Sequence, residues 1–355
     1  MTTFVPTPMI IRAYALGWAV FYMAVYFAFR DFFPAKVMID ALYIQGITET
    51  ASIDEATLGF ALIGTLLTVI PFAFQLVGLS NAAVLFALAR MTRTYQGMAI
   101  LTLLLLPMVY MVMPAPLKDT LVVAASTLLM LYAMRGPPPK RFLGVVIVGY
   151  LMFGLGLRDY YLLVLLVFIG LLLFSRTPGQ LKLLYVLPII LVLLFLPASV
   201  FEAVGGARDM VNEIYVYGLP EEDVRTFFVN PFPSDNGLHF VGNYIYAFVI
   251  LNIPFTRDVT FKEIVLFVNI ALCSGLMIYA LRRFGHDDVR RYLAFLFLSQ
   301  LLVFWIFEPD SGSYLRHVLT FVPFLMPTFL ALDEQLAARM TKIFKGPERQ
   351  PPREG

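Results

Sequence analysis

The chain has 355 residues, of which 60% are hydrophobic and 14% are charged, and its mean hydropathy is +0.80. Charged residues make up about a quarter of soluble domains, so this composition excludes an ordinary water-soluble fold and indicates an integral membrane protein. The net charge of +2 is too small to favour a nucleic-acid partner, and the single cysteine, Cys273, excludes an internal disulfide.

Long apolar stretches recur along the chain and predict transmembrane helices, because a backbone that crosses a membrane must satisfy its own hydrogen bonds. The stretches are continuous and lack the alternation of barrel strands. We predict an all-α, polytopic bundle in one domain, residues 1–336, followed by a disordered cytoplasmic tail, residues 337–355. About ten spans are predicted, at 10–29, 57–89, 97–113, 117–134, 142–157, 160–174, 183–196, 264–281, 292–307 and 315–332.

The second stretch, 57–89, is too long for one straight crossing, and we expect Pro71 and Gly78 to break or kink it. If it forms a hairpin, the following helices are inverted up to a compensating span at 241–253, which makes twelve spans. That alternative places the basic loop RGPPPKR outside, which the positive-inside rule disfavours. The ten-span interpretation makes 241–253 a surface or membrane-dipping helix.

Orientation follows from the basic residues in the loops. With both termini in the cytoplasm, 17 of the 26 Lys and Arg residues are inside and 9 are outside. Two long segments, 30–56 and 197–263, are then outer loops. Loops of this length in a tightly connected bundle are usually functional.

The most informative polar segment is EPDSGSYLRHVLTFVPFLMP, in which Glu308, Asp310, Arg316 and His317 cluster where the chain re-enters the membrane. Charges at a membrane rim are costly and commonly line a polar cavity. Arginine offers a planar donor fork for phosphate, and histidine moves a proton near neutral pH. The alternative is structural: Arg316 pairs with Asp310 and His317 only packs.

The segment GLRDYYLL forms a second candidate, a turn that contains Arg158, Asp159, Tyr160 and Tyr161. A tight outer turn needs no arginine, so we interpret Arg158 as a phosphate contact and the tyrosines as an aromatic platform for a sugar. The alternative is a surface contact between Arg158 and Asp159 beside ordinary interfacial tyrosines.

A third candidate is PAPLKDTL, where Lys118 and Asp119 open a helix. Asp119 suits the capping of a helix N-terminus, which is the structural interpretation, whereas the functional one makes Lys118 a further contact for a lipid phosphate. No Walker loop, zinc-ligand spacing, GxSxG elbow or dinucleotide fingerprint occurs, so the sequence does not support an ATP-driven or redox mechanism.

The layout resembles that of bacterial Wzy-type polysaccharide polymerases. The resemblance rests on the KD pair at a helix start, the RDYY turn, a large outer loop late in the chain and the segment SYLRHVLTFVPFLMP. In addition, EATLGF at 55–60, preceded by Asp40 and Tyr43, resembles the E-P-G-F element of the EpsG-like branch. It departs from that element because proline is absent and two residues intervene before Gly59.

The resemblance implies a glycosyltransferase-type polymerase that joins undecaprenyl-diphosphate-linked repeat units, for O-antigen or exopolysaccharide, at the outer face of the bacterial inner membrane. It implies no cofactor and no metal, because the sugar-diphosphate bond supplies the energy. The implied partners are the lipid-linked oligosaccharide donor and acceptor, membrane lipids and a chain-length regulator, with no nucleic acid.

The resemblance also assigns roles to residues. It makes His317 the base that deprotonates the acceptor, with His239 or Asp310 as substitutes. The residues expected to bind substrate are Arg158, Arg316, Lys118, Tyr160 and Tyr161.

Two other classes remain open. A GT-C-type glycosyltransferase that uses a lipid-monophosphate sugar has an acidic base in its first outer loop, for which Asp31 and Asp40 are candidates. A transporter or flippase for an anionic lipid or solute often shows internal repeats and broken helices near the midplane, and no repeat is present. A scaffold role leaves the outer arginines unexplained.

Overall fold

The computed structural model describes residues 5–28, 64–65, 69–70, 72–113, 118–206, 208, 227–253 and 261–345, and this part of the chain is helical apart from turns and one isolated β-bridge. The all-α prediction is therefore confirmed. The principal elements are α1 (Pro8–Ala28), α4 (Ala73–Arg90), α5 (Tyr95–Met111), α6 (Lys118–Met134), α7 (Pro139–Gly156), α8 (Tyr160–Arg176), η2 (Gly179–Leu181), α9 (Leu183–Phe195), α12 (Gly237–Asn252), α13 (Phe261–Arg283), α14 (Val289–Phe307), α15 (Ser311–Thr320) and α16 (Val322–Lys345).

Within these residues, α1, α4, α7, α13 and α14 are long and apolar enough to cross a membrane. The number rises to seven if each of two bent pairs, at 179–206 and 311–339, is one span. Helices α5, α6 and α8 have 17 residues each, the lower end of what a crossing needs. The ten-span count stays a prediction.

Helix α9 shows why lipid is the appropriate solvent. It is apolar on every side, and none of its residues is buried. Leu183, Leu194 and Phe195 are 68%, 67% and 77% exposed. Such a surface is unfavourable in water, and it is compatible with a hydrocarbon environment.

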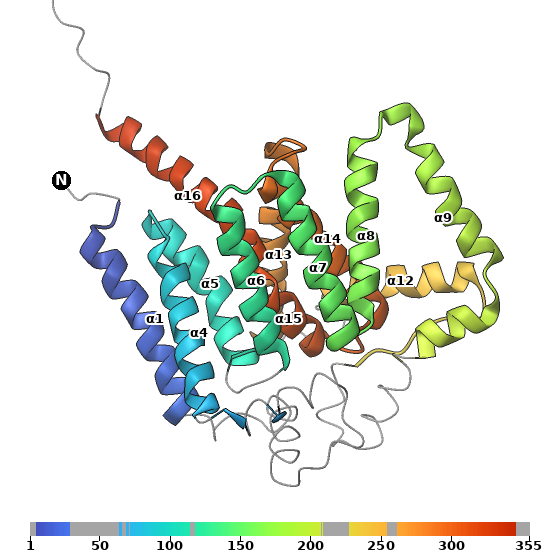
Figure 1. Cartoon of the computed structure of the whole chain (residues 1–355), viewed down its shortest axis with the longest axis horizontal. Coiled ribbons are helices and arrows are strands. Elements are labelled where there is room, and N and C mark those ends of the chain that lie inside the picture. The colour runs from blue at the N-terminus through green and yellow to red at the C-terminus, as the bar shows by residue number, and fades with distance from the viewer. Residues whose placement is uncertain are drawn as a thin grey trace, which may run out of the picture.

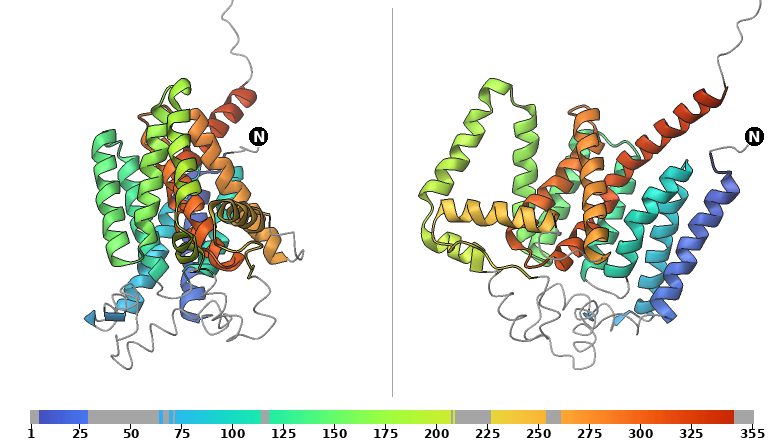
Figure 2. Two further views of the ribbon diagram at one scale, coloured as in Figure 1. Left: turned by 90° about the vertical axis from the view of Figure 1, so that its right-hand side faces the viewer. Right: turned by 180° about the vertical axis from the view of Figure 1, so that it is seen from behind.

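The helices run between two ends of the bundle (Figure 1). We call the end that contains residues 157–159 and 308–310 the site end, and the end that contains 91–94, 135–138 and 284–288 the opposite end. Figures 1 and 2 show that α1 begins, and α16 finishes, at the opposite end. This placement agrees with both termini sharing one side of a membrane.

Helices α1 and α4 form a closely packed antiparallel pair. Tyr26, near the end of α1, stacks on Phe74 at the start of α4, with ring centroids 4.6 Å apart. Helix α4 therefore starts at the end of the bundle where α1 finishes. In the twelve-span interpretation the two would lie at opposite ends, so this contact favours the ten-span one.

Of the break or kink predicted at Pro71 and Gly78, a break at Gly78 is excluded, because α4 continues through it. A Cβ atom at Gly78 would lie 2.8 Å from Cε1 of Tyr26, so glycine is required here for the close approach of α1. Pro71 lies outside the described residues, and α4 begins after Phe72, whose φ is 61°.

The last predicted span, 315–332, is not one helix. It is divided between α15 and α16, which are bent by 61° at Phe321. Pro323 lacks the N–H that would bond to the carbonyl of Leu319, and as the second residue of α16 it suits the start of a new helix. Helix α16 also extends to Lys345, so residues 337–345, which we predicted to be disordered, are helical.

Helix α12 contains most of the predicted 241–253 segment and lies across the direction of α8 and α14 (Figures 1 and 2). This direction is the one expected of a surface or membrane-dipping helix. Tyr314 ties α12 to the bundle, because its hydroxyl donates to Oδ1 of Asn252 at 3.0 Å and accepts from Nε1 of Trp305 at 3.0 Å.

Candidate functional site

Three segments separated in the sequence meet at the site end. They are the first turn of α6, the turn between α7 and α8, and the junction of α14 with α15. Their charged side chains are Asp119, Arg158, Glu308, Arg316 and His317, which we call the charged cluster. All three polar segments that the sequence singled out thus contribute to one site.

His317 lies at the centre of the charged cluster. Its Nδ1 atom is 2.5 Å from Oε1 of Glu308, and its Nε2 atom is 3.7 Å from Oδ1 of Asp119. The side chains of His317 and Glu308 are only 6% and 4% exposed. Nε2 makes no hydrogen bond to any residue that the structure describes. When the ring is neutral, a proton on Nδ1 directed at Glu308 leaves the lone pair on Nε2.

Arg316 contacts Asp119 as well. Its Nε atom lies 3.3 Å from Oδ2 of Asp119, and the two side chains are 16% and 4% exposed. Because Arg316 and His317 are consecutive on α15, the carboxylate of Asp119 lies beside both. Arg316 thus pairs with Asp119, not with Asp310 as the structural interpretation expected. Arg316 instead faces another helix.

Arg158 stands in the turn between α7 and α8. Its Nη1 atom lies 3.5 Å from the hydroxyl of Tyr160, and its Cζ atom lies 5.5 Å from the centre of that ring. Burial by itself lowers the pKa of Arg158, but interactions with Tyr160, Asp119 and Glu308 outweigh burial and raise it. Arg158 therefore shares the electrostatic environment of the other cluster residues although it pairs with neither carboxylate directly.

The acidic member of the α14–α15 junction is held in its charged form. Burial by itself raises the pKa of Glu308, but His317, through its charge and hydrogen bond, and Arg158 and Arg316 outweigh burial and lower it. Glu308 is therefore ionised at neutral pH. Among the described residues, no group of three or more His, Cys, Asp or Glu side chains has the geometry to hold a metal ion.

An aromatic wall adjoins the charged cluster. The ring of Tyr160 stacks on Phe307, with centroids 6.0 Å apart and planes inclined by 21°, and it meets Phe304 edge-on at 6.0 Å. Phe304 also lies 5.6 Å from the ring of His317, and Tyr161 lies 4.7 Å from Tyr160. Tyr161 is 4% exposed and packs in the core, so of the two tyrosines only the half-buried Tyr160 keeps a partly accessible ring.

Asp310 and His239 have other surroundings. Asp310 is the N-cap of α15, where its Oδ1 atom accepts from the backbone amides of Gly312 and Ser313 at 2.7 and 3.0 Å. His239 lies on α12, and its Nδ1 atom is 2.5 Å from Asp235. Within the described part of the chain, no contact joins His239 to the charged cluster. Lys118 is the first residue of α6, and its side chain lies outside the described part.

A further arginine contacts the end of α14. Arg208 is 3% exposed and donates to the carbonyls of Trp305 and Ile306, the last turn of α14, and to Oδ1 of Asn230 at 2.9 Å. Its guanidinium also lies 4.8 Å from the centre of the Phe228 ring. A cation at a helix C-terminus interacts favourably with the helix dipole, so Arg208 has a structural role next to the site.

Sequence reasoning underestimated Glu308 and Asp119. It noted both residues but interpreted Asp119 mainly as a helix cap, and it assigned neither a role in the site. Both are 3% exposed, and an acidic side chain is rarely buried without a cationic partner. In the sequence, the position of both residues at a helix end in an apolar segment indicated that they could be buried. It did not indicate which cationic side chain each one contacts.

Comparisons with known proteins give no match: no family model, no curated protein and no solved structure matches this chain. The function is therefore argued from the residues of the site.

Proposed function

We propose that this protein is a membrane glycan polymerase, which transfers a lipid-diphosphate-linked oligosaccharide to an acceptor sugar hydroxyl at the outer face of the inner membrane. One observation carries this proposal. An imidazole oriented by Glu308 lies beside the guanidinium of Arg316, in a buried cluster that Arg158 shares, at one end of an apolar helix bundle. A proton acceptor and two anion-binding groups are thus combined where a lipid-linked substrate arrives from the bilayer.

The reaction assigns one role to each nitrogen of His317. Nε2 takes the proton of the acceptor hydroxyl, and the hydroxyl oxygen attacks the anomeric carbon of the donor. The bond from that carbon to the diphosphate oxygen breaks, and the lipid diphosphate leaves with the electron pair. Glu308 holds Nδ1 and stabilises the imidazolium that forms, as a carboxylate does in a histidine-containing triad. Glu308 is thus a positioning residue.

The arginines act on the leaving group. A guanidinium binds phosphate oxygens through two parallel hydrogen bonds, and in a site that excludes water this interaction is strong. Arg316 is held by Asp119 in the ligand-free protein, so the donor diphosphate would replace that carboxylate as its anionic partner. The half-buried ring of Tyr160 is the aromatic surface available to the sugar, and Tyr161 packs against Tyr160 in the core.

Purified protein in liposomes with lipid-linked repeat units tests the proposal. We expect His317→Ala and His317→Gln to lose between about a hundredfold and ten-thousandfold in turnover while still binding the donor, because both variants lack a group that accepts a proton. Gln retains hydrogen bonding, so a purely structural His317 would tolerate it. Near-normal turnover of either variant at matched protein level would contradict the proposal.

The same assay separates the competing classes. If Asp31→Asn or Asp40→Asn abolishes turnover while His317→Gln does not, a GT-C-type transferase is favoured. If the donor crosses the membrane in liposomes but no chain extension is detected with wild-type protein, the protein is a transporter.

A further inference from the structure

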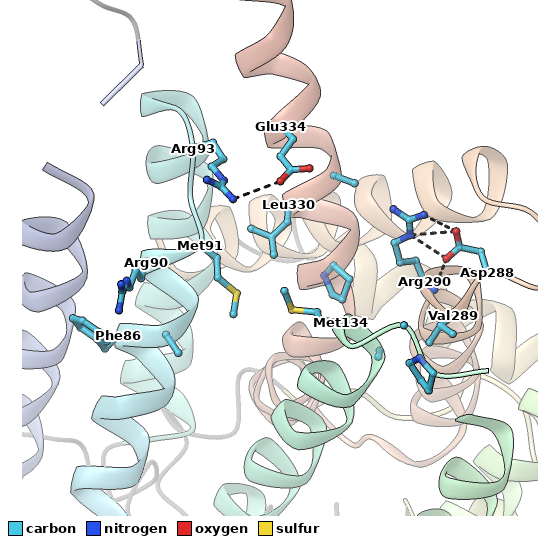
Figure 3. A pocket seen from close by; sticks show the side chains of 16 residues that line it. Phe86, Arg90, Met91, Arg93, Met134, Asp288, Val289, Arg290, Leu330 and Glu334 are labelled. Atoms are coloured by element: carbon cyan, nitrogen blue, oxygen red, sulfur yellow. Dashed lines mark hydrogen bonds and ion pairs between the residues drawn. The ribbon is translucent and has the colours of Figure 1, made fainter. Parts of the chain in front are cut away.

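A large pocket lies at the opposite end of the bundle, away from the charged cluster. It has a volume of about 910 Å³ and is formed by α4, α6, the start of α14, α16 and the neighbouring residues of the loops at 91–94, 135–138 and 284–288. Its walls are mainly apolar. Figure 3 shows Met91 and Met134 directed toward one another, with Leu330 between them.

Three arginines line the same pocket: Arg90, Arg93 and Arg290. Arg290 is committed to Asp288, with Nη2 2.6 Å from Oδ2 and Nε 3.0 Å from Oδ1. Arg93 contacts Glu334 at 3.7 Å, in a pair whose side chains are 62% and 63% exposed, so this pair is weak. Arg90 forms no ion pair with a residue that the structure describes.

Further positive charge surrounds the pocket mouth. Arg135, in the loop after α6, precedes the lining residues Gly136 and Pro137, and Lys140 and Arg141 follow them in the first turn of α7. All three basic side chains are exposed. The pocket therefore combines an apolar interior with a cationic rim, which are the two surfaces that an amphiphilic anion needs.

We propose that this pocket binds an anionic phospholipid of the cytoplasmic leaflet. Its phosphate contacts Arg90 and Arg93, and its acyl chains lie against the apolar walls between α4 and the α6–α16 pair. Basic pockets between transmembrane helices on the cytoplasmic side bind such headgroups, and nearby basic residues attract an anionic membrane surface. A soluble anion would gain nothing from Met91, Met134 or Leu330.

The pocket is separate from the charged cluster. Helix α6 begins at the cluster with Asp119 and ends at the pocket with Met134, so the two sites lie about 22 Å apart along the helix axis. The lipid proposal therefore does not depend on the catalytic one. A failed transfer assay leaves it intact.

Protein in a neutral detergent provides the test. Phosphatidylglycerol should raise the unfolding temperature more than phosphatidylcholine at the same mole fraction, because a ligand of the folded state stabilises it. The double variant Arg90→Gln/Arg93→Gln should lose most of this difference. The matched double variant Arg282→Gln/Arg283→Gln, two exposed arginines at the end of α13 that do not line the pocket, should retain it.

A third variant is expected to change the lipid effect in the opposite direction, so misfolding of the Arg90→Gln/Arg93→Gln variant cannot explain both results. Glu334→Gln releases Arg93 from its acidic partner, so it should increase the difference between the two lipids. The proposal is overturned if phosphatidylcholine stabilises equally, if inorganic phosphate reproduces the shift, or if both double variants lose it to the same extent. Native mass spectrometry should retain one phosphatidylglycerol on the wild type and on the Arg282/Arg283 variant only.

Discussion

The Nδ1 atom of His317 lies 2.5 Å from Oε1 of Glu308 across the junction of α14 and α15, and both side chains are almost completely buried. The residues are nine positions apart. The bend after Phe307 lets the end of one helix face the last turn of the next. A histidine with one nitrogen held in this way presents the other to a substrate, and the predictions below start from that relationship.

Replacing Glu308 should affect the rate of transfer more than the binding of the donor. Glu308→Gln keeps a hydrogen-bond acceptor for Nδ1 but removes the negative charge that stabilises the imidazolium, so kcat should fall while the KM for the donor changes little. Asp310→Asn makes the same change from carboxylate to amide at the N-cap of α15, and Asn is as good an N-cap as Asp. It should retain activity, and equal losses in both variants would contradict the assignment.

Acid pH should lower the stability of the wild-type protein, because Glu308 becomes protonated. Its pKa in the folded protein is lowered from the ordinary value of 4.5, so the folded state is stabilised above about pH 4.5 and loses this contribution as the pH falls through the folded pKa. The difference in unfolding temperature between the wild type and Glu308→Gln should therefore be largest near neutral pH and shrink below about pH 4.5. A difference that stays constant down to pH 3 would show that the ionised form is not stabilised by folding.

Arg316→Lys tests whether the geometry of the guanidinium matters. Lysine keeps the charge but loses the planar fork, so we expect a large loss of polymer at normal protein level. Arg176→Lys is the control, because Arg176 pairs with Asp287 at the opposite end, at 2.7 Å. Full activity of Arg316→Lys would show that only the positive charge of Arg316 matters, and not the planar geometry of its guanidinium.

The orientation of the bundle can be read from single cysteines in intact cells. Cysteines introduced at Pro138 and Thr177, at the opposite end, should resist a membrane-impermeant thiol reagent, while a cysteine introduced at Ser234 should react. Native Cys273 is buried and can be replaced by alanine for the experiment. Labelling at Pro138 would overturn the assignment of the charged cluster to the outer face.

Gly97 should be intolerant of a side chain. Asp333 accepts hydrogen bonds from the backbone of Arg93 and the hydroxyl of Thr94, both at 2.5 Å, and a Cβ atom at Gly97 would lie 2.6 Å from Cγ of Asp333. Gly97→Ala should cost about 1–3 kcal/mol of stability, measured as a lower unfolding temperature. Gly144→Ala, whose added Cβ meets nothing within 4 Å, should be neutral or slightly stabilising.

The sequence alone determined that the chain is an all-α bundle with apolar helices of membrane-spanning length, because hydropathy and helix length are local properties that every segment carries by itself. It also located the three polar segments of the site, since a charge in an apolar stretch is conspicuous. The break at Phe321 could not be predicted from Pro323 alone, because Pro107, Pro188 and Pro327 lie inside continuous helices.

Only the tertiary structure decided which charges meet. Asp119, Glu308 and His317 come from three helices, and their distances depend on how α6, α14 and α15 pack, to which hydropathy is insensitive. For the same reason the sequence did not separate Asp310, which caps its own helix, from Glu308, which reaches the imidazole. Burial turns such differences of a few ångströms into different roles, because a buried charge must be paired while an exposed one need not be.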